Sequence, residues 1–323
     1  MENLIYFLLR KSGLCFLSRK LLWRNRAAIL FYHNPRPVVL DAHLSYLKQI
    51  ATVVSLPELW NHFSHEPLAV VTIDDGEAEV FQLRETFEKH GVRPMIYLPT
   101  GIIRIGGGFW WHVFASGQQK LIESLKRVKN PERKKILRDF GFDQEGRVVP
   151  RQALEPNELR AMRDWADFGA HSRFHPILTQ CSDDECKEEI FASKIELEPQ
   201  VGYEFEHFAY PNGNYTDREI GYVREAGFQS ARTCDPGWNS PKTNRLRLKG
   251  LYIDDDASLD KFAVELTGIP AILRRILKRP YNLIRSALGS LRQVDAEEIS
   301  GAGAGKLLKQ RSQEQGGSPL GPP

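Results

Sequence analysis

Short apolar runs alternate with helical segments along this chain, and this rhythm constrains its fold more than any other feature. The run 68–73, LAVVTI, is uncharged and rich in valine, as expected of a strand buried on both faces of a sheet. Further apolar runs at 27–32, 94–98, 166–170 and 206–210 are separated by stretches with helical spacing. The alternation predicts parallel strands with helices outside them, and the length of 323 residues fits one large domain of the α/β barrel type as well as two smaller domains.

The rhythm changes between residues 101 and 167. Three glycines precede Trp110 and Trp111, and strongly charged helical stretches follow. We interpret residues 101–167 as a helical insertion that forms a lid over one end of the barrel. The two tryptophans could stack on sugar rings, since aromatic faces suit the apolar faces of pyranoses, or they could fix the lid to the barrel. The sequence favours neither role.

Both ends of the chain differ from the central part. Residues 1–26 mix large apolar residues with basic ones, as an interfacial amphipathic helix would, although a helix packed on the domain fits equally well. Residues 266–295 have the same basic and apolar character, and the Gly-rich tail 296–323 is expected to be disordered. The central domain is then 27–265. The shared character of both ends favours peripheral contact with an anionic membrane.

Composition excludes several classes of protein. The net charge of +3 is too small for the whole chain to be a nucleic-acid binder. Four cysteines without a C-x-x-C pair form no disulfide framework and suit a reducing compartment. The apolar run 4–9 is interrupted by Arg10 and Lys11, so it fits neither a secretory signal nor a membrane span. We expect a cytoplasmic protein, with peripheral contact at the inner face of the membrane. Its oligomeric state is not predicted.

Two carboxylates follow the predicted strand 68–73. In a parallel sheet, functional groups gather where strands end, and Asp74 and Asp75 lie at such an end, before a glycine that permits a sharp turn. Adjacent residues there point in different directions. One carboxylate can therefore bind a metal ion while the other accepts a proton. For the pair taken alone, a simple Asp-Gly turn is the better explanation.

A histidine pair follows another predicted strand end. His171 and His175 are separated by three residues, but Pro176 disfavours helical angles at His175, so this is not the helical pair of zinc proteases. A loop can still direct both rings to one point. With the carboxylate pair at a second strand end, a metal site with an open coordination position becomes the better explanation.

These motifs resemble those of the NodB-type polysaccharide deacetylases, carbohydrate esterase family four. TIDDG at 72–76 resembles the family's first motif, HSRFHP at 171–176 its second, and FAYPNG at 208–213 the third motif of one branch. The likeness spans about residues 27–265. It implies a distorted (β/α) barrel that removes N-acetyl groups, sometimes O-acetyl or formyl groups, from sugars.

The resemblance also implies roles for individual residues. Asp74 would be the general base, and the backbone N–H of Asn212 would stabilise the oxyanion. Asp75, His171 and His175 would hold one divalent metal ion, zinc above all, with cobalt, manganese or nickel as alternatives. Substrate contacts are expected from the segment containing Tyr210 and Pro211 and from the two tryptophans of the lid, Trp110 and Trp111.

The chain departs from the family pattern at two points. The third-motif arginine that would orient the base is replaced by Ala209, and the late histidine that would act as acid is absent. We therefore expect His33, at the end of the first strand, to protonate the departing amine. His207 and Lys249 are weaker candidates. A structural histidine bonded to the backbone explains His33 equally well.

The function expected from the sequence is metal-dependent hydrolysis of an N-acyl group, above all N-acetyl, on an amino sugar. The substrate would be a glycan, or a lipid-linked sugar if the basic ends do bind a membrane. A sugar deformylase would use the same residues. A catalytically silent glycan-binding module is the alternative from another class, and the presence of Asp74 argues against it. A metal-independent amidase is the weakest alternative, given the intact ligand set.

Overall fold

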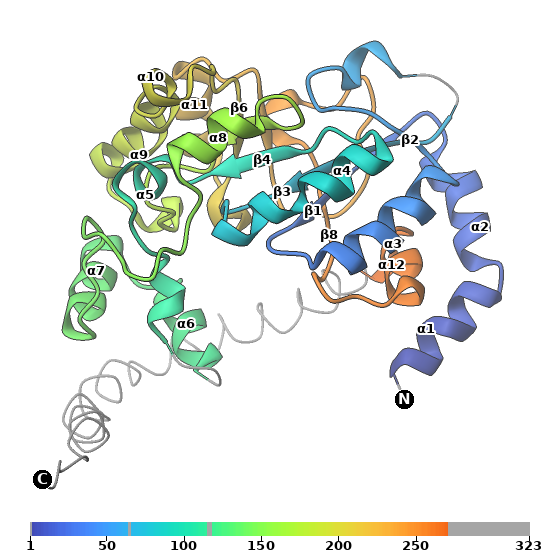
Figure 1. Ribbon diagram of the computed structural model, residues 1–323, viewed down its shortest axis with the longest axis horizontal. Helices are drawn as coiled ribbons and strands as arrows, with labels where there is room; N and C mark the ends of the chain where they lie inside the picture. The colour runs from blue at the N-terminus through green and yellow to red at the C-terminus, as the bar shows by residue number, and fades with distance from the viewer. Residues whose placement is uncertain (1, 64–65, 115–117, 271–323) are drawn as a thin grey trace, which may run out of the picture.

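The computed structural model describes residues 2–63, 66–114 and 118–270, which form a parallel barrel surrounded by helices (Figure 1). Its sheet has eight strands, with the order β7-β6-β5-β4-β3-β1-β8 and with β2 beside β3, and every pair of strands is parallel. The strands are β1 Ala27–Tyr32, β2 Thr52–Val53, β3 Leu68–Ile73, β4 Met95–Leu98, β5 Asp167–Ala170, β6 His207–Ala209, β7 Ser230–Arg232 and β8 Leu251–Tyr252.

The ring of strands is completed by irregular backbone between β7 and β8. Arg232 forms a single parallel bridge with Leu248, and the Thr233 N–H donates to the Leu248 carbonyl at 2.8 Å. From Leu251 onward the same segment pairs with β1. The predicted distorted (β/α) barrel is therefore confirmed. The segment before β8 is not extended throughout, because its first part forms the 3₁₀ turn Arg245–Arg247.

Alternate residues of each strand point into the barrel. The inner side chains form one apolar cluster, which includes Ala27, Ile29, Val70, Met95, Tyr97, Ala209 and Leu248. Their sequence neighbours face outward into a larger cluster between sheet and helices, as a two-residue period requires. When the inward-facing positions of β1, β3 and β5 are continued beyond the strand ends, the next residues are His33, Asp74 and His171. The strand period thus directs these three side chains toward the mouth of the barrel.

Helices cover the outside of the sheet (Figure 1). Proline at the first positions of α3 and α8 supplies a preset helical angle, and Ser182 caps α9 by accepting the Glu185 N–H at 3.2 Å. The helices around the barrel are α3 Pro37–Lys48, α4 Arg84–His90, α5 Thr100–Ile105, α8 Pro156–Met162, α9 Asp183–Ile195, α10 Glu198–Val201, α11 Asp217–Glu225 and α12 Leu259–Glu265.

The segment after α5 forms a small helical unit with its own core. It contains the 3₁₀ turn Trp110–Val113 and the helices α6 Gln119–Leu125 and α7 Asn130–Asp139. The core of this unit consists of Trp110, Phe114, Leu125 and Leu137. The Arg133 guanidinium of α7 lies over the Trp110 ring, 5.0 Å from its centroid, so a cation–π contact within this unit helps to hold the tryptophan.

The N-terminal residues form an arm of α1 Glu2–Lys11, α2 Leu14–Ser18 and a π-helical turn, Arg19–Trp23. The arm lies beside α12 and ends at Trp23, whose buried indole N–H donates to the Leu68 carbonyl at 2.9 Å. The arm is therefore attached to the domain along one side. The predicted helix and tail beyond residue 270 lie outside the described residues.

His43 makes the stability of the fold depend on pH. Burial lowers the pKa of this side chain to about 4, and its ring stacks on Phe262. Since the folded-state pKa lies below the unfolded value near 6.5, stability is highest at neutral pH and is lost as pH falls toward 4. The unfolding free energy of the wild type should therefore decrease between about pH 7 and about pH 5. We predict that this decrease is about 2 kcal/mol smaller in His43→Gln, as measured by urea titration.

A second buried histidine provides a check on this prediction. Burial also lowers the pKa of His207 to about 4, so His207→Gln should flatten the same pH dependence by a comparable amount. Wild-type pH dependence in both variants would contradict the assignment.

Candidate active site

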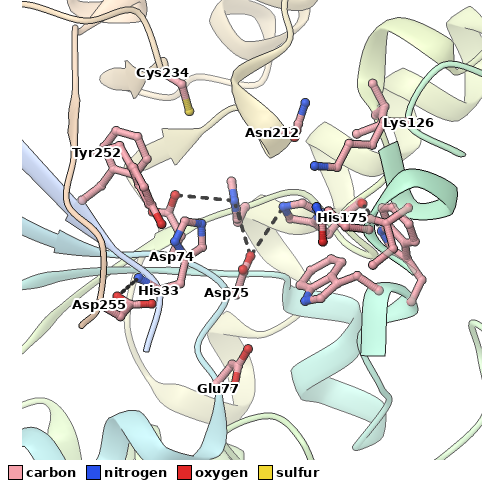
Figure 2. A pocket seen from close by; sticks show the side chains of 17 residues that line it. His33, Asp74, Asp75, Glu77, Lys126, His175, Asn212, Cys234, Tyr252 and Asp255 are labelled. Carbon is pink, nitrogen blue, oxygen red and sulfur yellow. Dashed lines mark hydrogen bonds and ion pairs between the residues drawn. The ribbon is translucent and has the colours of Figure 1, made fainter. Parts of the chain in front are cut away.

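A pocket of about 630 Å³ opens at the carboxyl ends of the strands, between the barrel and the lid. This volume lies within the range of small-molecule sites. Figure 2 shows that its side chains come from several strand ends and from α6. The lining residues are Phe31, His33, Asp74, Asp75, Glu77, Trp110, Trp111, Gln119, Ile122, Lys126, His171, His175, Ile177, Asn212, Cys234, Tyr252 and Asp255.

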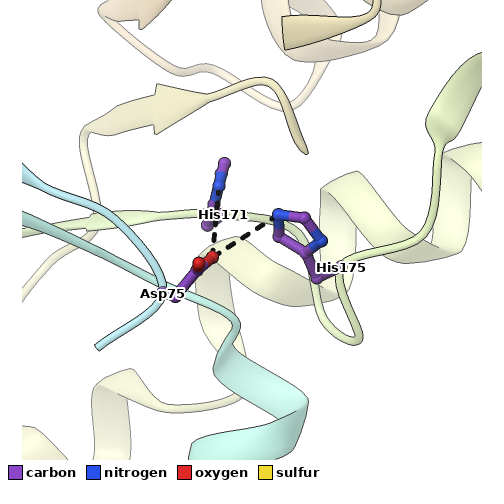
Figure 3. Close-up of side chains that lie close together, drawn as sticks. All are labelled: Asp75, His171 and His175. Atoms are coloured by element: carbon purple, nitrogen blue, oxygen red, sulfur yellow. Dashed lines mark ion pairs between the residues drawn. The ribbon is translucent and has the colours of Figure 1, made fainter. Parts of the chain in front are cut away.

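Three buried side chains at the bottom of this pocket converge on one point (Figure 3). The Asp75 Oδ1 atom lies 3.7 Å from His171 Nε2 and 3.5 Å from His175 Nε2. One possible ligand atom from each residue lies within 4.8 Å of the others. This is the only such group of three or more among the described residues. The predicted ligand residues are therefore brought together.

Left-handed backbone angles produce this convergence. Asp75, Ser172, His175 and Asn212 have φ values of 70°, 59°, 51° and 54°, and within the described chain only Asn25 is a further non-glycine residue of this kind. Such angles cost on the order of 1 kcal/mol each and concentrate at functional sites. At Asp75 the left-handed turn separates its carboxylate from that of Asp74. Gly76 follows with φ 63°, where a Cβ would lie 2.5 Å from the Leu98 side chain.

The tautomer of His171 is fixed by the barrel. Its Nδ1 lies 2.7 Å from the Ala209 carbonyl, which can only accept, so Nδ1 carries the proton. The Nε2 lone pair is then directed toward Asp75. This is the arrangement in which a backbone carbonyl orients a metal-binding imidazole.

The loop that carries His175 is held from two sides. Glu189 of α9 accepts the N–H groups of Arg173 and Phe174, both at 2.9 Å. On the lid side, the Trp110 indole donates to the His175 carbonyl at 3.2 Å. Trp110 is 3% exposed, so its buried side chain connects the lid to the histidine loop. Of the two roles that the sequence left open for Trp110, these contacts correspond to fixing the lid to the barrel, although the residue also lines the pocket.

The three side chains have the properties of a cation site. Burial lowers the pKa of His171 to about 4 and that of His175 well below its usual value, so both imidazoles are neutral ligands near pH 7. Burial, reinforced by Asp74 and Glu77 and opposed by His33, raises the pKa of Asp75 to about 7. Asp75 Oδ1 is also buried, and no group in the described part of the chain forms a hydrogen bond with it. A divalent ion would satisfy this oxygen and offset the cost of burying the charge.

Asp74 has a different environment, dominated by Arg232. This arginine lies at the end of β7, fully buried, and its guanidinium contacts Asp74 Oδ2 directly. The guanidinium also lies over the rings of Phe31 and Tyr97, at 4.2 and 5.4 Å. Burial acts to raise the pKa of Asp74, but Arg232, with His171 and His33, outweighs it, so this pKa lies below its usual value. The carboxylate is therefore ionised.

Arg232 corrects the sequence-based inference that no arginine orients the base. The substitution at Ala209 is real, but the guanidinium reaches Asp74 from β7. Sequence reasoning overlooked it, although the two-residue period of the strand could have located it. Ser230 and Arg232 face the barrel interior, while Ala231 between them belongs to the outer cluster. Glu77 and Lys126 are further pocket residues that the sequence did not indicate.

His33 reaches the pocket beside Asp74, as expected (Figure 2). Asp255 holds this strand end, because its two carboxylate oxygens accept the N–H groups of His33 and Asn34, both at 3.0 Å. The His33 ring packs edge-on against Tyr252 at 5.9 Å. By contrast, His207 is the first residue of β6, at the opposite end of the barrel, where it bonds to Ser230. Lys249 is not among the lining residues either.

Several predicted substrate contacts occupy different positions. Tyr210 is 1% exposed and its hydroxyl donates to the Leu246 carbonyl at 3.1 Å, so it is a core residue rather than a pocket wall. Pro211 is likewise buried and is not among the lining residues. Trp111 is partly exposed and lines the pocket, with its ring stacked on Phe109 at 5.1 Å. Asn212 lines the pocket at its left-handed turn.

The comparison with protein families agrees with the geometry of the site. The model of the polysaccharide deacetylase family matches residues 64–231, just over half of the chain. Comparison with curated proteins gave no match.

Several solved structures share the fold. Streptococcus pyogenes deacetylase PplD, in complex with acetate, has a TM-score of 0.55 at 17% identity, over 75% of this chain and 96% of its own. IcaB from Ammonifex degensii has a TM-score of 0.55 at 15% identity, over 75% of this chain and 97% of its own. A de-N-acetylase from Aggregatibacter actinomycetemcomitans has a TM-score of 0.52 at 13% identity, over 74% of this chain and 99% of its own. At these identities the likeness establishes the fold.

The ligand geometry predicts which carboxylates are needed to bind zinc. We expect one equivalent of zinc in the wild-type protein, and more than about 100-fold weaker binding in Asp75→Asn, because a direct ligand is lost. Asp255→Asn, a matched change in the same pocket outside the three-residue group, should keep its zinc. Elemental analysis after dialysis, with competition against a zinc chelator, checks both. Equal zinc binding by Asp75→Asn and the wild type would contradict the assignment.

Proposed function

The chain belongs to the polysaccharide deacetylase family, and on that premise we propose that it removes N-acetyl groups from an amino sugar with the help of a bound divalent metal ion. The substrate would be a polysaccharide or a glycan precursor. One observation supports this proposal above the others. An ionised carboxylate held by a buried arginine lies directly beside three converging metal-ligand side chains.

Asp75, His171 and His175 would hold the ion. One carboxylate oxygen and two imidazole nitrogens form the three-ligand set of catalytic zinc sites, and cobalt, manganese or nickel would suit the same donors. When bound, such an ion would lower the pKa of water and polarise the acetyl carbonyl.

Asp74 is the proposed general base. Arg232 occupies its Oδ2, while its Oδ1 finds no hydrogen-bond partner among the described residues and can accept a proton from the attacking water. Asp74 Oδ2 lies 3.9 Å from His171 Nε2, so the carboxylate is adjacent to the ligand group without belonging to it. Arg232 acts as a positioning residue, because it fixes the orientation and the ionised state of the base.

His33 is the proposed general acid, and Asn212 the proposed oxyanion donor. His33 lies in the pocket beside Asp74, at a strand end held by Asp255, and can deliver a proton to the departing amine nitrogen. The left-handed turn at Asn212 brings the third motif to the pocket, where its backbone N–H would stabilise the developing negative charge. Trp111 and Lys126 line the entrance and would contact the sugar.

The Arg232 contact argues against a silent glycan-binding module. A module that only binds sugar has no need for an ionised carboxylate held beside the ligand group at the cost of burying two charges. Deformylation would use the same residues, so the acyl group must be identified by its product. Acetate and formate release should therefore be measured in parallel.

The principal test compares Asp74→Asn with the wild type. We predict that Asp74→Asn retains one equivalent of zinc but loses acetate release from N-acetylated oligosaccharides by about 100-fold or more, because a base is removed without a ligand. His33→Ala should also keep its zinc and lose activity. Bound zinc without acetate or formate release from any acylated sugar by the wild type would refute the proposed function.

Arg232 should control the pH dependence of the reaction. In Arg232→Gln the strongest influence that lowers the pKa of Asp74 is lost. The carboxyl then protonates at higher pH, and the acidic limb of the kcat/KM profile moves upward. We expect kcat to fall by about 10- to 100-fold as well, since the base is no longer oriented.

Arg232→Lys is the matched control, because it keeps the positive charge but loses the planar fork. Its acidic limb should move less than that of Arg232→Gln. Thermal melting shows whether each variant is folded. Folded variants whose acidic limb coincides with that of the wild type would contradict the role of Arg232.

A further inference from the structure

The N-terminal arm exposes an unusual concentration of large apolar side chains. Among the described residues, seven of the twelve exposed large hydrophobic side chains lie between positions 4 and 21. Leu21 is 67% exposed, Phe16 63% and Leu8 57%. We call the exposed set the arm surface, which consists of Leu4, Ile5, Phe7, Leu8, Phe16, Leu17 and Leu21.

The opposite side of the arm is already packed against the domain. Tyr6, Leu9 and the buried Cys15 contact Ala263 and Val264 of α12 in one apolar cluster. Arg10 and Asp260 form an ion pair at 2.8 Å. Ser18 donates to the Thr267 carbonyl at 3.3 Å. Because these contacts fix the arm, the arm surface cannot turn inward without breaking them.

Positive charge surrounds the arm surface. Lys11, Lys20 and Arg24 are exposed, and none of them takes part in an ion pair found in the described part of the chain. After Glu2 no acidic residue occurs before Asp41. The arm therefore combines exposed apolar side chains with unneutralised cations, which complements the apolar interior and anionic headgroups of a lipid surface.

We propose that the arm surface inserts into one leaflet of an anionic membrane and places the domain at the lipid headgroups. None of the described helices is long and apolar enough to span a bilayer. With 10 residues, α1 is about 15 Å long, half the thickness of a hydrocarbon core, so the arm lies along the interface. A second copy of the chain is disfavoured as the occupant, because the two sets of cations would repel each other. The proposal does not depend on the reaction catalysed.

Sedimentation of the full chain with lipid vesicles tests this proposal. We expect binding to vesicles of phosphatidylcholine mixed with phosphatidylglycerol, and at least about tenfold weaker binding to phosphatidylcholine alone. The double variant Leu17→Ser/Leu21→Ser should bind the mixed vesicles at least about tenfold more weakly than the wild type. The matched control is Val149→Ser/Ile195→Ser, which changes two exposed apolar side chains away from the arm and should bind normally.

A second set of variants isolates the charge contribution. The preference for phosphatidylglycerol should be mostly lost in the triple variant Lys11→Gln/Lys20→Gln/Arg24→Gln. The control changes three exposed lysines outside the arm and should keep the preference: Lys135→Gln/Lys187→Gln/Lys242→Gln. Acetate release from a soluble oligosaccharide should be unchanged in every variant, which shows that the domain is folded.

Two results would overturn the proposal. One is arm variants that bind the mixed vesicles as the wild type does. The other is a wild type that ignores both kinds of vesicle and that light scattering shows to be a dimer, with Leu17→Ser/Leu21→Ser monomeric. That result would assign the arm surface to a second copy of the chain.

Discussion

The buried ion pair between Arg232 and Asp74 is the interaction on which the site depends. Both partners lie inside the barrel and are almost fully buried. Removing two charges from water costs several kcal/mol per ion, which direct contact and good geometry must offset. The rings of Phe31 and Tyr97 flank the guanidinium and contribute cation–π attraction. Arg232 also bridges to Leu248, so the residue that orients the carboxylate helps to close the barrel.

Two adjacent carboxylates acquire different chemistry from this arrangement. Asp74 continues the inward set of β3 and meets Arg232, which keeps it ionised. Asp75 adopts a left-handed angle and turns toward the two imidazoles, where burial outweighs the opposing influence of His33 and raises the pKa of Asp75 to about 7. The difference in pKa between the two neighbours follows from which side chain each one meets. The strand end thus gives the proposed proton acceptor and the proposed metal ligand different surroundings, although the two residues are adjacent in the sequence.

Much of this arrangement could be predicted from the sequence, because it depends on local periodicity. The apolar runs located β1, β3, β4, β5 and β6, and the carboxyl ends of parallel strands had to bring Asp74 and His171 to one edge. Motif spacing then indicated which side chains could bind a metal ion. The change in composition after residue 101 led us to expect an insertion there, and the segment after α5 has an apolar core of its own.

Other features depend on contacts between distant segments, which the sequence does not reveal. The two-residue period of β7 places Arg232 inside the barrel, but Arg232 and Asp74 are 158 residues apart, and only the structure shows that they are in contact. Trp110 became a structural connection, and Tyr210 a core residue, only once the partners of their N–H and O–H groups were known. The cytoplasmic location stays a prediction.

The central claim is that a divalent ion is held by three side chains while Asp74 stays outside the coordination sphere. Anomalous diffraction at the zinc edge from crystals of the zinc-loaded protein tests it most directly. We predict one strong peak about 2.0–2.2 Å from Asp75 and from the imidazoles of His171 and His175, with Asp74 still paired to Arg232. A peak elsewhere, or coordination of the ion by Asp74 with Arg232 released, would contradict this account.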